Sequence, residues 1–110
     1  MLTLYQAEWC PYSSSVRQRL TELGLDFVAR QVAPEPDERA ELRERAGTDS
    51  IPVLETDDEQ FLQGTDAIFA YLERYDVPPQ ARAHRRQYHG HREERDEESP
   101  KILERSASVD

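Results

Sequence analysis

Apolar residues that alternate with polar ones predict short β-strands at four places in the chain. Near the N-terminus, Leu2 and Leu4 alternate with Thr3 and Tyr5, which is the period of a half-buried strand. The same reasoning, with apolar runs bounded by turn residues, predicts strands over 2–5, 26–32, 51–54 and 60–62. The acidic turn at 57–59 joins the last two strands into a hairpin.

Apolar residues three or four positions apart predict three helices between these strands. The first begins at Pro11, where a proline is tolerated because the first helical N–H has no partner, and it ends at Gly24. A second, polar helix is predicted over 37–46 and ends at Gly47. A third opens after Gly64, with an inward face made of Ile68, Phe69, Leu72 and Tyr75.

The resulting order is β-α-β-α-β-β-α within the first 77 residues. The first two strands and their crossover helix form a βαβ unit, which is right-handed by rule, and the hairpin adds an antiparallel pair. We therefore predict an α/β domain over 1–77, in which three helices flank a four-stranded mixed sheet. Pro78 and Pro79 end this domain, and 78–110 are predicted to be a polar, charged tail, flexible or partly helical, with no packed core.

Charge excludes some classes of partner. The formal net charge is −9, and all of it belongs to residues 1–77, which hold 16 acidic side chains against 7 arginines. Such a surface repels nucleic acid and anionic lipid. A single lysine, Lys101, among 14 basic residues suggests a salt-rich, halophile-like cytoplasm. We expect a cytoplasmic protein, since no signal-like segment and no apolar run near the ~18 residues of a membrane span is present.

The single cysteine is the strongest candidate for chemistry. Cys10 stands immediately before a predicted helix, whose free N–H groups and dipole stabilise a thiolate, the form that attacks disulfides. Pro11 and the polar neighbours predict an exposed turn; the alternative is a buried, inert cysteine. Ser13, at the C-x-x-S position, either donates a hydrogen bond to the sulfur or is an ordinary first-turn residue.

Other residues have both a structural and a functional interpretation. Pro52 precedes a strand, and the residues alone leave its peptide bond open between trans and cis. Thr65 and Asp66 open the third helix, where they either cap it or leave its N–H groups to a ligand carboxylate; Asp66 is also suited to a ligand ammonium. We predict no metal site, and the three tail histidines, His84, His89 and His91, are expected to be solvated.

Three separated motifs resemble those of glutaredoxins. The sequence Cys10-Pro11-Tyr12-Ser13 resembles their C-P-Y-C active site without its second cysteine, the segment around Pro52 looks like T-V-P, and Gly64-Thr65-Asp66 looks like G-G-x-D-D. The stretch from Ile51 to Leu72 is equally similar to the N-terminal domain of glutathione S-transferases. Together the motifs cover residues 2–75 in order.

This resemblance implies a thioredoxin-like fold with a cis proline at Pro52 and Cys10 as nucleophile. It also implies a site for a thiol ligand, in which the ligand pairs with the backbone of Ile51 and its γ-glutamyl end is held by Thr65 and Asp66. Pro11, Tyr12, Ile51, Pro52, Thr65 and Asp66 are the ligand-binding residues that follow from it.

Several departures from the family pattern bear on the ligand. Ala7, Thr48 and Asp49 stand where glutaredoxins carry basic residues, which weakens a site for the glycine carboxylate of glutathione. Gly64 replaces the Glu of the transferase Glu-Ser pair, and we expect no counterpart of the transferase C-terminal helical domain. Pro11 and Tyr12 also depart from the C-G-F-S sequence of the iron–sulfur class.

We therefore expect a monothiol glutaredoxin-like oxidoreductase that reduces mixed disulfides between proteins and a small thiol through Cys10. It needs no tightly bound cofactor, is expected to be a monomer, and uses glutathione or γ-glutamylcysteine as co-substrate, the latter favoured by the missing basic residues. Two alternatives stay open. One is a dimer that holds a [2Fe–2S] cluster with Cys10 of each chain and two external thiols; the other is a transferase-like interaction module in which Cys10 is idle.

Overall fold

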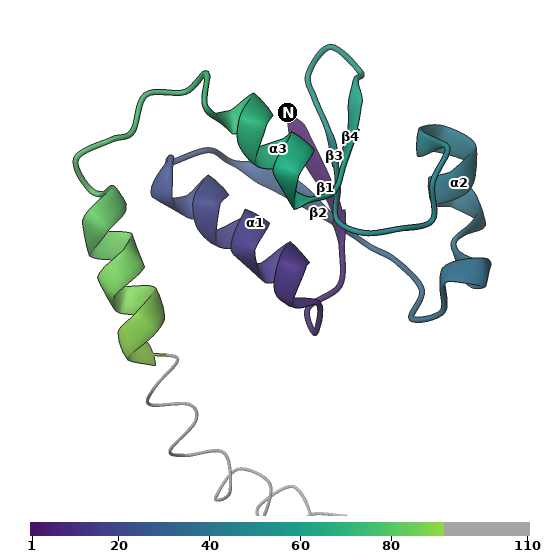
Figure 1. Ribbon diagram of the computed structural model, residues 1–110, viewed down its shortest axis with the longest axis horizontal. Helices are drawn as coiled ribbons and strands as arrows, with labels where there is room; N and C mark the ends of the chain where they lie inside the picture. Colours follow the sequence, from purple (N-terminus) through teal and green to yellow (C-terminus); the bar gives the residue numbers. More distant parts are fainter. Residues whose placement is uncertain (92–110) are drawn as a thin grey trace, which may run out of the picture.

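A computed structural model describes residues 1–91 of the chain (Figure 1). Its four strands form one mixed sheet in the order β2-β1-β3-β4. The strands are β1 (Leu2–Gln6), β2 (Phe27–Gln31), β3 (Val53–Glu55) and β4 (Phe61–Gln63). The helices between them are α1 (Pro11–Glu22), α2 (Ala40–Ala46), preceded by a 3₁₀ turn at Pro36–Glu38, and α3 (Thr65–Leu72).

The sheet combines one parallel and two antiparallel pairs. β1 runs parallel to β2 and antiparallel to β3, and β3 pairs with β4 as a hairpin. The predicted α/β fold, with its four-stranded mixed sheet and its order of elements, is therefore confirmed, and it is a thioredoxin-like fold.

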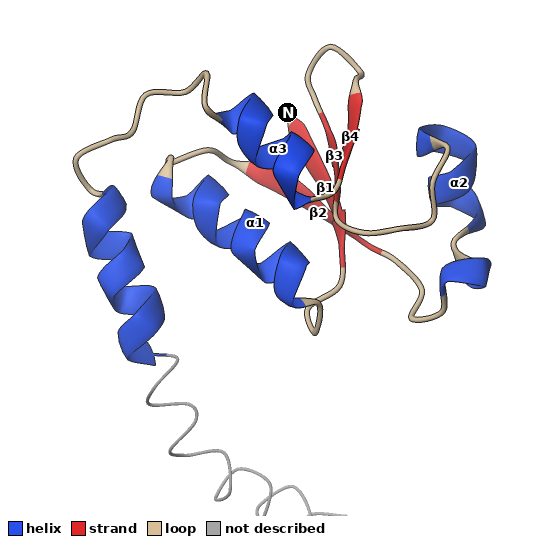
Figure 2. Cartoon of the chain, in the orientation of Figure 1, coloured by secondary structure: helices blue, strands red, loops and turns tan. Residues whose placement is uncertain are grey.

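The two faces of the sheet have separate cores, because successive strand residues point to opposite faces. α1 and α3 cover one face, where Leu4 and Leu54 are fully buried against them (Figure 2). α2 lies on the other face, where Leu42 packs with Tyr5 and Val53. Of the predicted inward face of α3, Ile68 and Leu72 are buried, whereas Phe69 and Tyr75 are half-buried.

The predicted helix over 37–46 is interrupted at Arg39. This residue has non-helical φ and ψ of −92° and 53°, and its side chain is buried, with 6% exposed. Its guanidinium donates to the carbonyls of Ala33, Pro34 and Asp49 at 2.8 to 3.0 Å. The sequence shows a charged residue in a polar segment, so an inward-pointing arginine that breaks the helix was not predicted.

The chain continues into another helix over 81–91, which lies beside α1 (Figure 1). Arg85 forms an ion pair with Glu22 of α1 at 2.7 Å, and the Tyr88 and Ser14 hydroxyls are 3.1 Å apart. The sequence did not indicate these contacts, because each uses a polar side chain that is equally stable in water. The rest of the predicted tail, 92–110, lies outside the described residues, and the domain boundary at residue 77 stays a prediction. Among residues 1–91 no helix has both the length and the apolar character to cross a bilayer.

Candidate active site

The strand register brings the three predicted motifs to one end of the sheet. Tyr5 of β1 pairs with Val53 of β3, and Val53 pairs in turn with Gln63 of β4. The loop to Cys10 leaves β1 just beyond this row, Pro52 precedes it on β3, and α3 begins directly after Gln63. Cys10, Ile51-Pro52 and Thr65-Asp66 therefore all follow or precede the same row of paired residues (Figure 1).

Cys10 is the N-cap residue of α1, with φ of −79° and ψ of 118°. The expectation of an exposed turn is wrong for its side chain, since only 6% of the residue is exposed. The reason is its position as N-cap, which turns a side chain back toward the N–H groups of the first turn. The residues next to Cys10 are exposed instead: Trp9 is 65% and Tyr12 63% exposed, and Pro11 is exposed as well.

The surroundings of the sulfur lower the pKa of Cys10 below that of an ordinary thiol. Burial by itself raises this pKa, because it removes water from the charged form. The backbone and hydroxyl of Ser13, the backbone N–H of Tyr12 and the positive charge of Arg17 act in the opposite direction and outweigh burial. The neutral thiol makes no capping hydrogen bond of normal geometry, so these donors act on the thiolate.

The Ser13 hydroxyl is an unusual buried group. Ser13 is fully buried, and its Oγ has no hydrogen-bond partner among residues 1–91. Buried hydroxyls are normally paired, and an unpaired one costs about 1–3 kcal/mol. The charge of an ionised Cys10 offers this hydroxyl an acceptor, so the cost is recovered when the thiol loses its proton.

Arg17 is a contributor to the site that sequence reasoning missed. Arg17 lies seven residues after Cys10, which is two helical turns along α1. This spacing puts Arg17 on the same side of α1 as Cys10, and it is the sequence signal from which the role of Arg17 could have been predicted. Its guanidinium binds the buried side-chain oxygen of Gln6 and forms an ion pair with Glu8 at 3.3 Å. Gln6 in turn donates to Gln31 at 3.0 Å, so a polar chain fixes Arg17 near the end of β1.

The Ile51–Pro52 peptide bond is cis, as the resemblance implied. Pro52 is fully buried, Ile51 is half-buried, and the Pro52 carbonyl accepts a hydrogen bond from the Gly64 N–H at 2.9 Å. This bond ties the segment before β3 to the start of α3. Arg39 holds the same segment from the other side through the Asp49 carbonyl.

The start of α3 is open to a ligand. Gly64 is the N-cap residue with a φ of 91°, a conformation that favours glycine, and it provides no side chain to cap the helix. Thr65 is half-buried and Asp66 is exposed in the first turn, and neither is recorded as capping α3. The prediction that Thr65 or Asp66 caps the helix is therefore wrong, and the N–H groups of the first turn of α3 remain available to a ligand.

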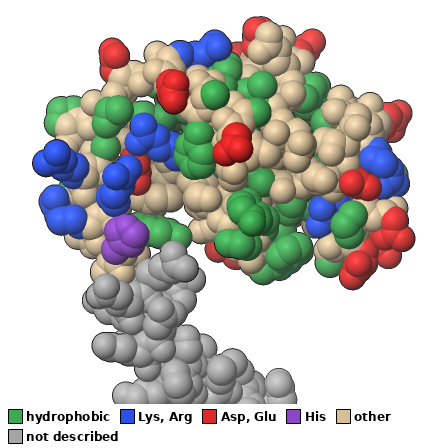
Figure 3. Space-filling model, in the orientation of Figure 1, with side chains coloured by type: hydrophobic (Ala, Val, Ile, Leu, Met, Phe, Trp, Pro, Cys, Tyr) green, Lys and Arg blue, Asp and Glu red, His purple; other side chains and the backbone are tan. Residues whose placement is uncertain are grey.

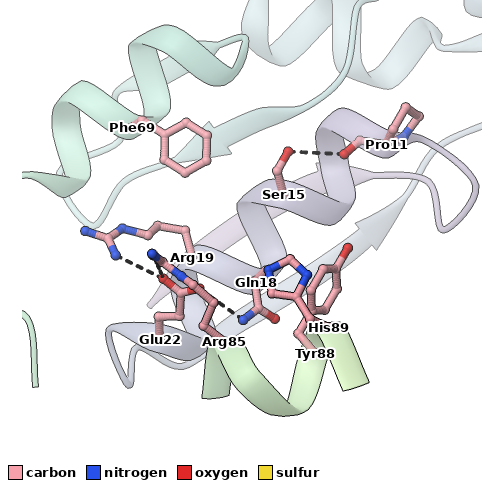
Figure 4. A pocket seen from close by; sticks show the side chains of 9 residues that line it. All are labelled: Pro11, Ser15, Gln18, Arg19, Glu22, Phe69, Arg85, Tyr88 and His89. Atoms are coloured by element: carbon pink, nitrogen blue, oxygen red, sulfur yellow. Dashed lines mark hydrogen bonds and ion pairs between the residues drawn. The ribbon is translucent and has the colours of Figure 1, made fainter. Parts of the chain in front are cut away.

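A groove runs from the residue after Cys10 along α1. It encloses about 410 Å³ between α1, α3 and the helix over 81–91 (Figure 4). Phe69 points into it from α3, and Ser15 bonds the Pro11 carbonyl at its other end. Its lining residues are Pro11, Ser15, Gln18, Arg19, Glu22, Phe69, Arg85, Tyr88 and His89.

Within residues 1–91, no three or more His, Cys, Asp and Glu side chains gather closely enough to hold a metal ion. His84, His89 and His91 are all exposed on the helix over 81–91. Among the described residues, none of these histidines belongs to a group of that kind with Cys10.

Comparison by sequence gives one matching family model and one related protein. The family model described as "Glutathione S-transferase, N-terminal domain" matches residues 4–80, which is most of the described chain. A glutaredoxin of Pseudomonas aeruginosa is 34% identical over 53 residues, which are 48% of this chain and 63% of that protein.

Solved structures show the same fold. A glutathione S-transferase of Rhodospirillum rubrum F11 is 31% identical, with a TM-score of 0.58 over 67% of this chain and 33% of its own. Glutaredoxin 2 of Salmonella typhimurium, solved in complex with glutathione, is 21% identical, with a TM-score of 0.58 over 66% of this chain and 32% of its own. The chain thus spans about a third of the length of these two proteins.

The similarity to the Salmonella protein shows the fold alone. The family model, by contrast, covers residues 4–80, which include Cys10, the cis proline Pro52 and the start of α3. On this evidence, the chain belongs to the glutathione S-transferase N-terminal domain family.

Proposed function

We propose that this protein is a monothiol thiol–disulfide oxidoreductase that reduces mixed disulfides between proteins and a low-molecular-weight γ-glutamyl thiol. The observation that supports it most is the environment of Cys10. First-turn N–H groups, the unpaired Ser13 hydroxyl and the Arg17 charge all favour the thiolate, which is the attacking species in disulfide exchange. A buried cysteine with only a structural role stays a neutral thiol, and it does not need a hydroxyl donor beside its sulfur.

The reaction has two exchange steps. The Cys10 thiolate attacks the sulfur of the small thiol in the mixed disulfide; that S–S bond breaks, and the protein leaves as a thiolate that takes a proton from water. Cys10 then carries the small thiol as a new disulfide. The thiolate of a free small-thiol molecule attacks this disulfide, releases the Cys10 thiolate and leaves as the oxidised dimer of the small thiol. One free small thiol thus takes the place of the protein in the disulfide, and the protein is left as a thiol.

The proposed ligand site follows from the other two motifs. The small thiol lies along the Ile51 backbone beside Pro52, and the carboxylate of its γ-glutamyl end accepts hydrogen bonds from the free first-turn N–H groups of α3. Asp66, exposed in that turn, pairs with the γ-glutamyl ammonium. Trp9, Pro11 and Tyr12, which are exposed next to Cys10, meet the incoming disulfide first.

The expected thiol lacks the terminal glycine of glutathione. The two arginines near this end of the sheet are engaged elsewhere: Arg17 binds Gln6 and Glu8, and Arg39 is buried among carbonyls. Asp49 stands where glutaredoxins have a positive residue, and its carboxylate pairs with Arg43 at 3.5 Å, so neither side chain offers a free positive charge to a glycine carboxylate. γ-Glutamylcysteine has no glycine, and its terminal carboxylate is that of the cysteine itself, so it needs no positive charge at the place of the glycine carboxylate.

The test is reduction of the mixed disulfide between hydroxyethyl thiol and γ-glutamylcysteine by the wild-type chain and by Cys10→Ser. Serine is a good N-cap residue, so we expect the variant to keep the fold, as checked by its thermal unfolding, and to lose turnover. Thr21→Val, which removes a surface hydroxyl at the far end of α1, is the control and should keep wild-type rates. Turnover that survives in Cys10→Ser would contradict the proposal.

A further inference from the structure

The helix over 81–91 carries a row of positive charge on a chain that is otherwise acidic. Arg82, Arg85, Arg86 and His89 stand at positions i, i+3, i+4 and i+7, so they share one face of the helix. All four are exposed, and basic side chains gather over this part of the molecule (Figure 3). We call this row the cationic stripe. No acidic residue occurs between 80 and 92, whereas residues 1–77 hold more than twice as many acids as arginines.

The stripe is continuous with the groove that begins next to Cys10. A second hollow of about 640 Å³ is lined by the four residues of the stripe, and it shares Arg85 and His89 with the groove. Arg82 to His89 span about 10 Å of helix. The two hollows together therefore form an extended surface that suits a length of chain better than a compact small molecule.

The charges of this surface are only partly neutralised from within. Glu22 is the one acidic residue in the two linings, against Arg19, Arg82, Arg85 and Arg86. Its oxygens are occupied by Arg85, Arg19 and Gln18 at 2.7 to 3.2 Å. Arg82 and Arg86 have no ion pair among residues 1–91, and a guanidinium offers paired N–H donors that match a carboxylate.

The groove also has an apolar wall. Phe69 is half-buried and points into the space that Pro11 and the Tyr88 ring border (Figure 4). A ligand that satisfies both parts has carboxylates for the stripe and an apolar side chain for the Phe69 wall.

We propose that the cationic stripe and the groove bind an acidic segment of the protein substrate, so that the substrate class of Cys10 is a mixed disulfide whose cysteine lies close in sequence to several Asp or Glu and an apolar residue. This inference rests on the proposed function for its place in catalysis. The groove starts at Pro11, so a segment that lies in it holds the neighbouring disulfide at the start of α1. The positive charges of the stripe attract the acidic segment even though the chain is acidic as a whole, because salt screens the repulsion from its acidic residues beyond ~8 Å.

Binding is tested first, without any chemistry. A fluorescein-labelled peptide of Glu and Asp around one Phe is titrated with the full chain, and anisotropy is followed at low and physiological salt. We expect saturable binding that weakens with salt, no binding of the matched Lys peptide, and about three- to tenfold weaker binding by Arg82→Gln/Arg86→Gln. Arg30→Gln/Arg43→Gln, which removes the same charge from β2 and α2, should bind like the wild type.

Activity then separates this inference from the proposed function. Peptide mixed disulfides with acidic or basic flanks are compared with the hydroxyethyl mixed disulfide. We expect kcat/KM to favour the acidic peptide, and Arg82→Gln/Arg86→Gln to lose that preference while it keeps the hydroxyethyl rate. Turnover of the hydroxyethyl substrate without peptide binding overturns the docking surface alone; peptide binding without any turnover overturns the proposed function alone. Tighter binding of a single-stranded oligonucleotide than of the acidic peptide also overturns this inference, because it assigns the stripe to nucleic acid.

Discussion

The Glu22 carboxylate of α1 accepts both hydrogen bonds of one guanidinium, that of Arg85, at 2.7 and 3.2 Å. Arg85 belongs to the helix over 81–91, so this forked pair joins that helix to the thioredoxin-like domain. The Arg85 hydrogen bonds are the main reason that the pKa of Glu22 falls to about 2, with Gln18 and Arg19 acting in the same direction against burial. The ionic part of this attachment therefore depends on the charge of a single carboxylate, beside the contact between the Tyr88 and Ser14 hydroxyls.

We predict that acid weakens this attachment over a defined pH range. The pKa of Glu22 is lower in the folded chain than its ordinary value of 4.5, so its contribution to stability is complete above pH 4.5 and is lost as the pH falls toward 2. The protection of the amides of residues 81–91 against hydrogen exchange, taken relative to the intrinsic exchange rate at each pH, should fall in the wild type across this range. Protection that is the same at pH 5 and pH 2.5 would contradict the account.

The same carboxylate can be removed by mutation. Glu22→Gln leaves Arg85 and Arg19 with one neutral acceptor oxygen in place of a carboxylate, and we expect a loss of about 1–3 kcal/mol in the free energy of unfolding at pH 7. Glu73→Gln removes an exposed carboxylate at the end of α3, and we expect a change within about 0.5 kcal/mol. Chemical denaturation of both variants gives the comparison; equal stabilities would show that the pair contributes nothing.

Ser13→Ala separates stability from reactivity. Removal of an unpaired buried hydroxyl should leave the fold equally stable or up to about 1 kcal/mol more stable. The pKa of Cys10 should rise, because the thiolate loses the Ser13 hydroxyl as a donor. Thermal unfolding and the pH dependence of thiol alkylation measure the two effects, with Thr21→Val as control. A variant that is destabilised and keeps the wild-type alkylation profile would assign Ser13 to packing alone.

We predict that Arg39 stabilises the segment before Pro52, whose Asp49 carbonyl it binds. Its three hydrogen bonds to carbonyls are buried, so Arg39→Met should cost at least about 2 kcal/mol, since charged hydrogen bonds are lost and the carbonyls keep no donor. Arg43 also donates to two carbonyls, but it is 41% exposed, and Arg43→Met should cost less than about 1 kcal/mol. Similar losses in both variants would contradict this role.

Asp49→Lys tests the choice of small thiol. The substitution places a positive charge before Pro52, and it keeps the backbone carbonyl that Arg39 binds. We expect kcat/KM with glutathione to rise relative to that with γ-glutamylcysteine by a few-fold, about what a 1 kcal/mol ion pair gives. Asp26→Lys makes the same charge change just before β2, at the other end of the sheet, and should leave the ratio unchanged. A ratio that moves equally in both variants reflects net charge and not the site.

The sequence predicted the fold well because its signals are local. Alternation in β1, Pro11 at a helix start and glycines after helices each act within a few residues, and the elements lie where these signals put them. The breaks in this agreement come from contacts that reach beyond these few residues. Arg39 interrupts its helix because its guanidinium reaches the carbonyls of Ala33 and Asp49, and nothing in the neighbouring sequence records that contact.

The candidate site shows the same division. The positions of Cys10, Pro52 and Thr65 at one end of the sheet follow from the order of elements, but the burial of Cys10 does not. Exposure was inferred from polar neighbours, whereas the side chain of Cys10, at the N-cap of α1, is buried. The link between Glu22 and Arg85, 63 positions apart, joins two residues that are each ordinary in their own segment.

The pH dependence of Cys10 alkylation tests the central claim most directly, because Cys10 is the single thiol of the chain. Iodoacetamide reacts with the thiolate, so the rate measured against pH gives the titration of this sulfur in the native protein. We predict a midpoint below the ordinary thiol value of ~8.5, which the unfolded chain in denaturant should restore. A native midpoint at or above that of the unfolded chain would contradict an activated Cys10 and the redox function built on it.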